Sequence, residues 1–309
     1  MTTAKHTLAY KAMELQPLSS SHEAYHDAFQ TYRAKSTLRE VVLSYSRQAA
    51  AHVIHKLITH DAPVFRVLGV GSGDGKADME ILKAVARGLR SSKDGHSKPQ
   101  IAACTVEPSS LLIADFKRSA STLPEELANL ADVSFDWQET TFDGFISESS
   151  WTSELFHLAH FICSLYYMDA EESLKSCFKL LTPGGAMFCL VIKENSFFDI
   201  LVRQGNLKRL PIPGFYTGQD VVVIAERNNW KHEELPMTHY EVDITDCFNE
   251  SSQTGSLLLD FLSHTVNFRE LADPALYKEM MDFITEASST DSKGKMILRP
   301  QLSVVVIYK

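Results

Sequence analysis

The chain has 309 residues, of which 44% are hydrophobic and 22% charged, and its formal net charge is -9. This composition supplies enough apolar surface for a large buried core, and it lacks the Lys and Arg clusters that nucleic-acid-binding proteins carry. No run of about 18 apolar residues is present, which argues against a membrane-spanning helix. We therefore expect neither nucleic acid nor a membrane as a partner.

The first residues are polar and lack the apolar stretch of a signal peptide. We expect a flexible N-terminus over residues 1–20, followed by a single domain over 21–309 in a cytoplasmic protein. The five cysteines form no Cys-x-x-Cys pair and lie in apolar patterns, which indicates buried free thiols in a reducing compartment. The histidines near the N-terminus have no Cys or acidic partner at zinc-site spacing, so we expect no metal.

An amphipathic helical stretch runs from His22 to about Leu57. Within it, Tyr25, Phe29 and Tyr32 repeat at positions i, i+4 and i+7, which places their rings on one face of a helix. Such an aromatic stripe is typical of a face packed into a core, and it can also line a ligand pocket.

A short apolar strand then runs directly into Gly71, Gly73 and Gly75, and from there into a helical pattern. Because glycine has no Cβ, this turn can adopt positive φ and bring main-chain N–H groups close to a ligand at the N-terminus of the helix. A dinucleotide-binding turn needs a third glycine where Lys76 stands. The G-x-G-x-G spacing is instead the form found in methyltransferases that use S-adenosylmethionine (AdoMet). A strand-to-helix turn without a ligand is the alternative.

A second strand, Ile101–Glu107, ends on an acidic residue. In an open parallel sheet it lies beside the first strand, which brings Glu107 to the crevice where the glycine turn opens. A carboxylate there can accept hydrogen bonds from both ribose hydroxyls of a nucleoside, and Ser109 adds a hydroxyl from the same loop. The alternative is that Glu107 and Ser109 cap the next helix.

The rest of the chain alternates strands and helices. Further strands are expected over 133–137, 155–162, 186–192, 231–245 and 302–308, with helices over 77–89 and 170–181. This order predicts an α/β fold with a doubly wound, seven-stranded, Rossmann-like sheet. The segments 196–229 and 246–300 are too long for plain connections. We expect them, together with the N-terminal helical segment 21–60, to bind substrate.

These residues resemble the histamine N-methyltransferases along nearly the whole chain. The resemblance is carried by the order and spacing of short motifs: His22-Glu-Ala-Tyr25 with Phe29, the glycine turn with Asp78–Leu82, Val106–Ser109, Leu165–Tyr167, Asp243–Phe248, Asp260–Leu262, Asn267-Phe268 and Leu302-Ser303. It implies a class I AdoMet-dependent methyltransferase with strand order 3-2-1-4-5-7-6. It also implies a monomeric cytosolic enzyme that acts on a small amine.

The resemblance also implies site residues. AdoMet would contact Gly71, Gly73, Glu107, Ser109, Thr141 and Ile162. The amine would lie against Tyr25, Phe29, Tyr32, Tyr166, Tyr167 and Phe261. Of these, Tyr166 and Tyr167 are expected to take part in catalysis by orienting the attacking lone pair; the alternative is that both rings only pack the end of the fourth strand.

Several positions depart from the family pattern. Leu38 stands where the family has the glutamate that holds the ammonium of histamine, and Pro300 where it has an asparagine near the imidazole. Cys163 replaces a glutamine, and Phe198 and Val202 replace two tryptophans of the pocket wall. A cation in a closed apolar pocket without a counter-charge costs several kcal/mol, so we expect histamine to be a poor substrate. A bulkier or less polar amine, or an imidazole compound with a carboxylate, fits these residues better.

Methyl transfer from a sulfonium to a nitrogen lone pair depends mainly on alignment and needs no metal. The sequence therefore favours a small-molecule N-methyltransferase with altered specificity, because Gly71, Gly73, Glu107 and Ser109 are intact. Two alternatives stay open. One is a protein that keeps the fold and binds a ligand or partner without turnover, and the other is a true histamine N-methyltransferase with a rearranged pocket.

Overall fold

The computed structural model describes residues 15–57, 63–92, 98–148, 155–212, 214–237 and 239–309. The chain forms two compact units. The sheet unit comprises residues 37–199, 213–240 and 300–309, and the smaller unit comprises residues 1–36, 200–212 and 241–299. Each unit has its own buried core.

The sheet unit is built on seven strands in the order β3-β2-β1-β4-β5-β10-β6. Their bounds are β1 (Val64–Val70), β2 (Gln100–Val106), β3 (Asp132–Gln138), β4 (Phe156–Ile162), β5 (Leu181–Ile192), β6 (Lys231–Leu235) and β10 (Leu302–Tyr308). Strands β1 to β5 pair in parallel, and β10 runs antiparallel to both β5 and β6. Since β10 is the last strand of this sheet along the chain, the expected order 3-2-1-4-5-7-6 is confirmed.

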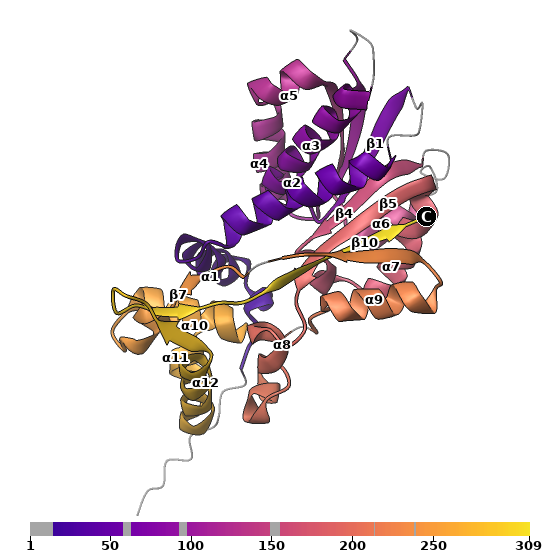
Figure 1. The fold of residues 1–309 in the computed structure, drawn as a ribbon. Helices are drawn as coiled ribbons and strands as arrows, with labels where there is room; N and C mark the ends of the chain where they lie inside the picture. The colour runs from indigo at the N-terminus through magenta and orange to yellow at the C-terminus, as the bar shows by residue number, and fades with distance from the viewer. Residues whose placement is uncertain (1–14, 58–62, 93–97, 149–154, 213, 238) are drawn as a thin grey trace, which may run out of the picture. The chain divides into compact units, whose positions relative to one another are not determined.

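Helices cover both faces of this sheet (Figure 1). On one face, α2 (Leu38–Leu57) packs on β4, β5 and β10 and on α3 (Lys76–Ser92), which in turn contacts α5 (Glu125–Leu130). Helix α4 (Ser110–Ala120) places Phe116 against the aromatic rings of β3. The other face carries α6 (Phe142–Ser147), α7 (Ala170–Leu180) and α9 (Gly218–Arg227). The doubly wound α/β prediction is therefore confirmed.

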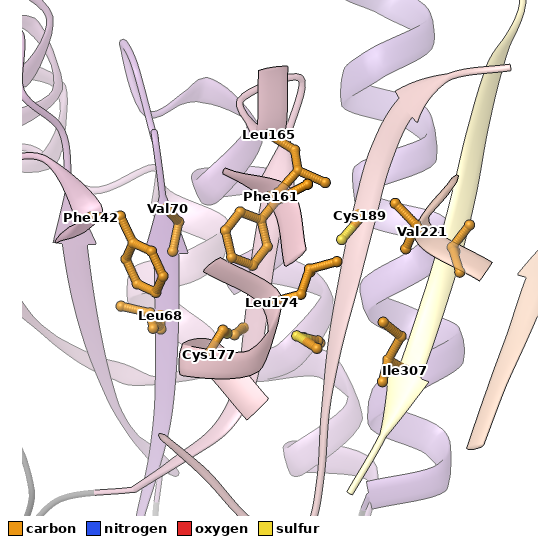
Figure 2. Close-up of a cluster of buried hydrophobic side chains, with 14 of the residues drawn as sticks. Leu68, Val70, Phe142, Phe161, Leu165, Leu174, Cys177, Cys189, Val221 and Ile307 are labelled. Carbon is orange, nitrogen blue, oxygen red and sulfur yellow. The ribbon is translucent and has the colours of Figure 1, made fainter. Parts of the chain in front are cut away.

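The core under α7 and α9 is shown in Figure 2. Leu68 of β1, Phe161 of β4 and Cys189 of β5 are fully buried there, and Leu174 of α7 packs among them. Strands β4, β5 and β10 consist largely of buried residues rather than alternating ones. This is the pattern expected for strands that have helices on both faces.

The smaller unit is mainly helical. It contains η1 (Leu18–Ser20), α1 (His22–Ala34), η4 (Gly205–Arg209), η5 (Thr245–Phe248), α10 (Gln253–Ser263), α11 (Phe268–Leu271) and α12 (Pro274–Glu286), with a small sheet of β7 (Val242–Asp243), β9 (Met296–Leu298) and β8 (Ser288–Thr290). Helix α1 packs against α10. The buried Asp260 carboxylate accepts hydrogen bonds from the N–H groups of Asn267 (3.0 Å) and Phe268 (2.7 Å), which fixes the turn after α10.

The expected flexible start, residues 1–20, lies mostly outside the described residues. At the end of this segment, Leu18–Ser20 form a short 3₁₀ helix, and the side chain of Leu18 is buried. The backbone N–H of Leu18 donates to the carbonyl of His264 (2.7 Å). Segment 196–229 begins with α8 (Phe197–Leu201) and continues through η4 to α9, and segment 246–300 holds α10 to α12.

One expected element is wrong: the helical stretch from His22 to Leu57 is two helices. Helix α1 ends at Ala34 and α2 begins at Leu38. The residues between the two helices pair with another segment as in a β-sheet. The Lys35 carbonyl accepts from the Asp243 N–H (2.8 Å), and Ser36 forms a β-bridge with Val242. No glycine or proline marks this break, so the periodicity alone could not reveal it.

Two strand boundaries also differ from expectation. Strand β5 begins at Leu181, five residues before the expected start at 186, and runs through a proline and two glycines. Strand β6 ends at Leu235, well before the expected end at 245, because Pro236 has no N–H to donate to a ladder. The next extended residues, Val242–Asp243, pair with β9 in the smaller unit instead.

Four of the five cysteines are buried, and Cys163 is only half-buried; all five are free thiols. Among the residues that the structure describes, no helix is both long enough and apolar enough to cross a membrane. Within the same ranges, no three or more His, Cys, Asp or Glu side chains are grouped in a way that could hold a metal ion.

Candidate cofactor and acceptor site

Hydrogen bonds link the carboxyl ends of strands β1, β2 and β4, at the point in the sheet where the strand order reverses. Strand β1 lies between β2 and β4, and in open α/β sheets ligands bind beyond the carboxyl ends of the strands at such a point. The Gly71 N–H donates to the carbonyl of Val106 at the end of β2 (2.8 Å). The Ser164 hydroxyl, just after β4, donates to the carbonyl of Val70 at the end of β1 (2.6 Å). This edge is where the sequence placed the cofactor.

The three glycines of the turn have positive φ, as expected: 67° at Gly71, 56° at Gly73 and 72° at Gly75. A Cβ on Gly71 would lie 2.5 Å from the Cβ of Ser164, and one on Gly75 would overlap the ring of Phe116. At Gly73 an added Cβ would meet nothing within 4 Å. Packing therefore requires two of the glycines, whereas the third borders open space from which a ligand can approach the main chain.

This difference predicts different outcomes for two alanine substitutions. Gly71→Ala should lower the free energy of unfolding by about 1–2 kcal/mol, because it combines left-handed backbone strain with a clash against Ser164. Gly73→Ala should cost less stability, because only the backbone strain applies, yet it should weaken AdoMet binding by filling the open space. Denaturant unfolding and calorimetric titration of both variants check this. Equal stability losses would contradict the assignment of the two glycines.

Glu107 is held by the glycine turn. It is only 6% exposed, and its Oε2 accepts from the Gly73 N–H (2.8 Å) while its Oε1 accepts from the Ser109 N–H (2.8 Å). Its own N–H donates to the carbonyl of Gln138 at the end of β3 (3.0 Å). Each carboxylate oxygen has a second lone pair, so Glu107 can still accept the two ribose hydroxyls of AdoMet.

The capping alternative is compatible with this arrangement. Ser109 is the N-cap of α4, and its hydroxyl accepts from the Leu112 N–H (3.4 Å). The cap uses the hydroxyl of Ser109 and one lone pair of Glu107, and it leaves the other carboxylate lone pairs available. The held carboxylate and the open face at Gly73 thus fit a nucleoside cofactor.

The other two expected cofactor residues lie at strand ends of the same sheet. Thr141 follows β3, and its hydroxyl accepts from the Gly144 N–H (3.1 Å) as the N-cap of α6. Ile162 is the last residue of β4 and is half-buried. Their contact with AdoMet stays a prediction.

A buried polar cluster beneath the turn was missed by the sequence reasoning. The Ser72 hydroxyl donates to Oδ1 of Asp78 (2.8 Å), and Nε2 of His160 lies 3.4 Å from the same oxygen. Burial raises the pKa of Asp78 to about 7 and lowers that of His160 to about 3. The available signal was an acid in the first turn of the helix after the glycines, together with a histidine inside an otherwise apolar strand.

Tyr166 and Tyr167 lie in a 3₁₀ turn, η3 (Leu165–Tyr167), directly after β4. Just before it, Cys163 adopts a positive φ of 52°, and its N–H donates to the carbonyl of Leu190 (2.8 Å). The phenol of Tyr166 is hydrogen-bonded to the thiol of Cys163. A phenol is a better donor than a thiol, so the Tyr166 O–H points to the sulfur.

The environments of these groups differ. Burial raises the pKa of Tyr166 well above its usual value and that of Cys163 to about 11, so both are neutral at neutral pH. Tyr167, in contrast, is 59% exposed. The Tyr166 ring makes edge contacts with Tyr167 (centroids 6.1 Å apart) and Phe215 (5.7 Å), and Phe215 contacts Phe198 (5.6 Å). Phe215 is an aromatic neighbour that the sequence reasoning did not name.

The remaining expected aromatic residues meet in the smaller unit. Ring centroids are 5.8 Å apart for Tyr25 and Phe29, 5.6 Å for Phe29 and Phe261, and 4.3 Å for Tyr32 and Phe261. The expected single face of α1 is thus confirmed, and it packs on α10. Tyr32 is fully buried, whereas Tyr25 and Phe29 are half-buried. Their role in binding the acceptor stays a prediction.

Leu38 and Pro300 are two positions where the resemblance led us to expect a departure from the family pattern. Leu38 is half-buried as the first residue of α2, and the neighbouring Arg39 is exposed. Pro300 is buried just before β10, and its carbonyl accepts from the Tyr240 N–H (3.1 Å). Neither side chain offers a carboxylate or an amide, and the effect of this on acceptor binding stays a prediction.

Comparison with curated proteins finds histamine N-methyltransferases along nearly the whole chain. The chain is 28% identical over 301 residues to histamine N-methyltransferase A of Xenopus laevis, covering 95% of this chain and 98% of that protein. It is 25% identical over 302 residues to the Bos taurus enzyme, covering 96% and 99%. No protein-family model matches the chain. The resemblance expected from the motifs is confirmed.

Comparison with solved structures finds methyltransferase folds. Loganic acid methyltransferase with S-adenosylhomocysteine (SAH) has a TM-score of 0.50 at 13% identity, covering 87% of this chain and 93% of that one. The plantazolicin methyltransferase BamL, also with SAH, has a TM-score of 0.47 at 12% identity, covering 94% and 92%. At these identities the likeness to loganic acid methyltransferase bears on the fold alone.

Proposed function

We propose that this chain is a methyltransferase that uses AdoMet and transfers the methyl group to a nitrogen of a small amine or imidazole compound other than histamine. The proposal that AdoMet is the methyl donor rests on the Glu107 carboxylate, which accepts hydrogen bonds from the N–H groups of Gly73 and Ser109. Gly73 also borders open space from which a ligand can approach. The acceptor part is supported by near full-length similarity to histamine N-methyltransferases. It also rests on Leu38, at the position where the resemblance implies an ammonium-binding glutamate.

In the proposed site, the residues bind and align the reactants. Glu107 accepts the ribose hydroxyls, and Gly71 and Gly73 let the main chain approach the cofactor. AdoMet supplies a methyl group that is already activated by the positive charge on its sulfur. Alignment of the nitrogen lone pair with that methyl group then accounts for most of the rate acceleration that the protein provides.

Tyr166 is the residue that we propose to orient the acceptor. Because its O–H points to Cys163, its oxygen lone pairs can accept an N–H of the acceptor, which turns the nitrogen lone pair toward the methyl group. The edge contacts with Tyr167 and Phe215 hold the phenol ring in place. As the new C–N bond forms, the S–C bond breaks, and the nitrogen releases its proton to solvent water.

The two alternatives make different predictions. A non-catalytic protein with this fold binds AdoMet or a partner and forms no methylated product. A histamine N-methyltransferase with a rearranged pocket turns over histamine as well as any other acceptor. The expected monomeric state and cytoplasmic location are further proposals that rest on the resemblance.

Product detection distinguishes these functions. The protein is incubated with AdoMet carrying an isotope-labelled methyl group and with a metabolite extract, or with a panel of imidazoles, aryl amines and histidine dipeptides. Mass spectrometry should find the label on a nitrogen of at least one acceptor, and the same reaction with Glu107→Ala should give far less product. Binding of AdoMet without any labelled product would support the non-catalytic alternative.

A further inference from the structure

A polar cluster lies beneath the glycine turn in the sheet unit. The Ser72 hydroxyl donates to Oδ1 of Asp78 (2.8 Å), and His160 Nε2 lies 3.4 Å from the same oxygen. Asp78 is 6% exposed and His160 2%, and within the described part of the chain Nδ1 of His160 has no hydrogen-bond partner. A Cβ on Gly69 would overlap the Asp78 carboxylate and the Ser72 hydroxyl. The cluster therefore fits beside strand β1 only because residue 69 is a glycine.

We propose that Asp78 is a positioning residue for the cofactor, which acts through Ser72 on the backbone amide that holds Glu107. Ser72 stands between Gly71 and Gly73, and the hydrogen bond from its hydroxyl to Asp78 fixes the orientation of its side chain. The next N–H, that of Gly73, donates to Oε2 of Glu107. This inference rests on the proposed function, because it concerns AdoMet bound at Glu107.

We also expect the charge of the Asp78 carboxylate to affect which ligand binds. A buried carboxylate without a cation is costly. Among the described residues no Lys or Arg forms an ion pair with Asp78, and the imidazole of His160 beside it is neutral, because burial lowers its pKa to about 3. AdoMet brings a sulfonium charge that SAH lacks. An ionised Asp78 beneath the turn therefore favours AdoMet over SAH, because charges interact strongly where water is excluded.

The titratable groups around Asp78 come from every neighbouring element. They are Asp74 in the glycine turn, Glu107 after β2, Cys104 on β2 and His160 on β4. Burial raises the pKa of Asp78 to about 7, and the charges of Asp74 and Glu107 add to that rise. Burial also raises the pKa of Cys104 and lowers that of His160 to about 3, so both stay neutral while Asp78 changes charge.

Binding measurements with two variants test the proposal. AdoMet and SAH are titrated by calorimetry into the wild type and Asp78→Asn at pH 6 and pH 8. Asparagine keeps the size and an oxygen for Ser72, and it cannot ionise. AdoMet binding favours ionised Asp78 and so lowers its pKa, which means that affinity rises with pH. Relative to Asp78→Asn, the wild type should gain about 3- to 10-fold in AdoMet affinity between the two pH values and less for SAH.

Ser72→Ala tests the positioning step separately. It removes the bond to Asp78 and should weaken both AdoMet and SAH about 3- to 10-fold at either pH. Comparing variants at the same pH cancels the titration of the ligand's own groups. Glu80→Gln is the matched control, because Glu80 lies on the same helix, pairs with Lys83 and Arg47, and should leave binding unchanged.

The outcomes separate this inference from the proposed function. If the wild type binds AdoMet and both Asp78→Asn and Ser72→Ala bind it with wild-type affinity and pH dependence, Asp78 has no positioning role. Equal losses in Glu80→Gln would assign the effect to the helix rather than to the cluster and would also overturn the proposal. If Asp78→Asn does not fold, Ser72→Ala decides the positioning step by itself. A wild type that binds neither ligand would remove the proposed function as well.

Discussion

Histamine should be a poor acceptor, with a kcat/KM on the order of 10⁴-fold below that of the best acceptor of this enzyme. A site loses heavily when the substrate's polar groups end up without partners. Leu38, the half-buried first residue of α2, offers no charge to an ammonium group. Pro300 has no side-chain amide, and its carbonyl already accepts from Tyr240. The neighbouring cation at Arg39 adds repulsion toward a positively charged acceptor.

The measurement is kcat/KM for histamine against a panel of imidazoles, aryl amines and histidine dipeptides. Leu38→Glu should raise activity on histamine, although Arg39 can pair with the new carboxylate and reduce the gain. Leu38→Gln is the matched control, because it has a similar size and no charge, and it should raise activity much less. Wild-type turnover of histamine that equals or exceeds every other panel member would show that other residues recognise the ammonium group.

Glu107→Ala should weaken AdoMet binding by roughly 1.5–3 kcal/mol, which is about 10- to 150-fold in Kd. The substitution removes the acceptors for the ribose hydroxyls, and it also frees the N–H groups of Gly73 and Ser109 from their partner. Glu107→Gln should lose affinity too. Both neighbouring groups are donors, and the glutamine amide would have to turn its NH₂ toward one of them.

Calorimetric titration with AdoMet and SAH measures these losses. Glu226→Ala, on the exposed side of α9, is the control for a loss of charge away from the turn. The stability of each variant is followed by thermal unfolding, so that a loss of affinity is not confused with a loss of fold. If Glu107→Ala kept wild-type affinity, Glu107 would not be part of the cofactor site, and the acid at the end of β2 would serve only to order the loop.

The sequence by itself determined the sheet and the turn. Buried strands are short apolar runs between turn residues, and their alternation with helices predicts a doubly wound sheet. The order of the strands in that sheet, in contrast, followed from the resemblance to the histamine N-methyltransferases. The positive φ at Gly71, Gly73 and Gly75 also followed from residue type alone. The strand positions and the conformation of the turn rest on signals that lie within a few residues of the feature that they predict.

Only the tertiary structure decided which distant residues meet. The break between α1 and α2 depends on pairing of Ser36 with Val242, two residues far apart along the chain. Similarly, Asp78 meets His160 because β1 and β4 are neighbours, and Tyr166 meets Phe215 across a long insertion. Hydrogen bonds and packing between distant segments outweigh local preference at such places, and a single sequence carries no local mark of them.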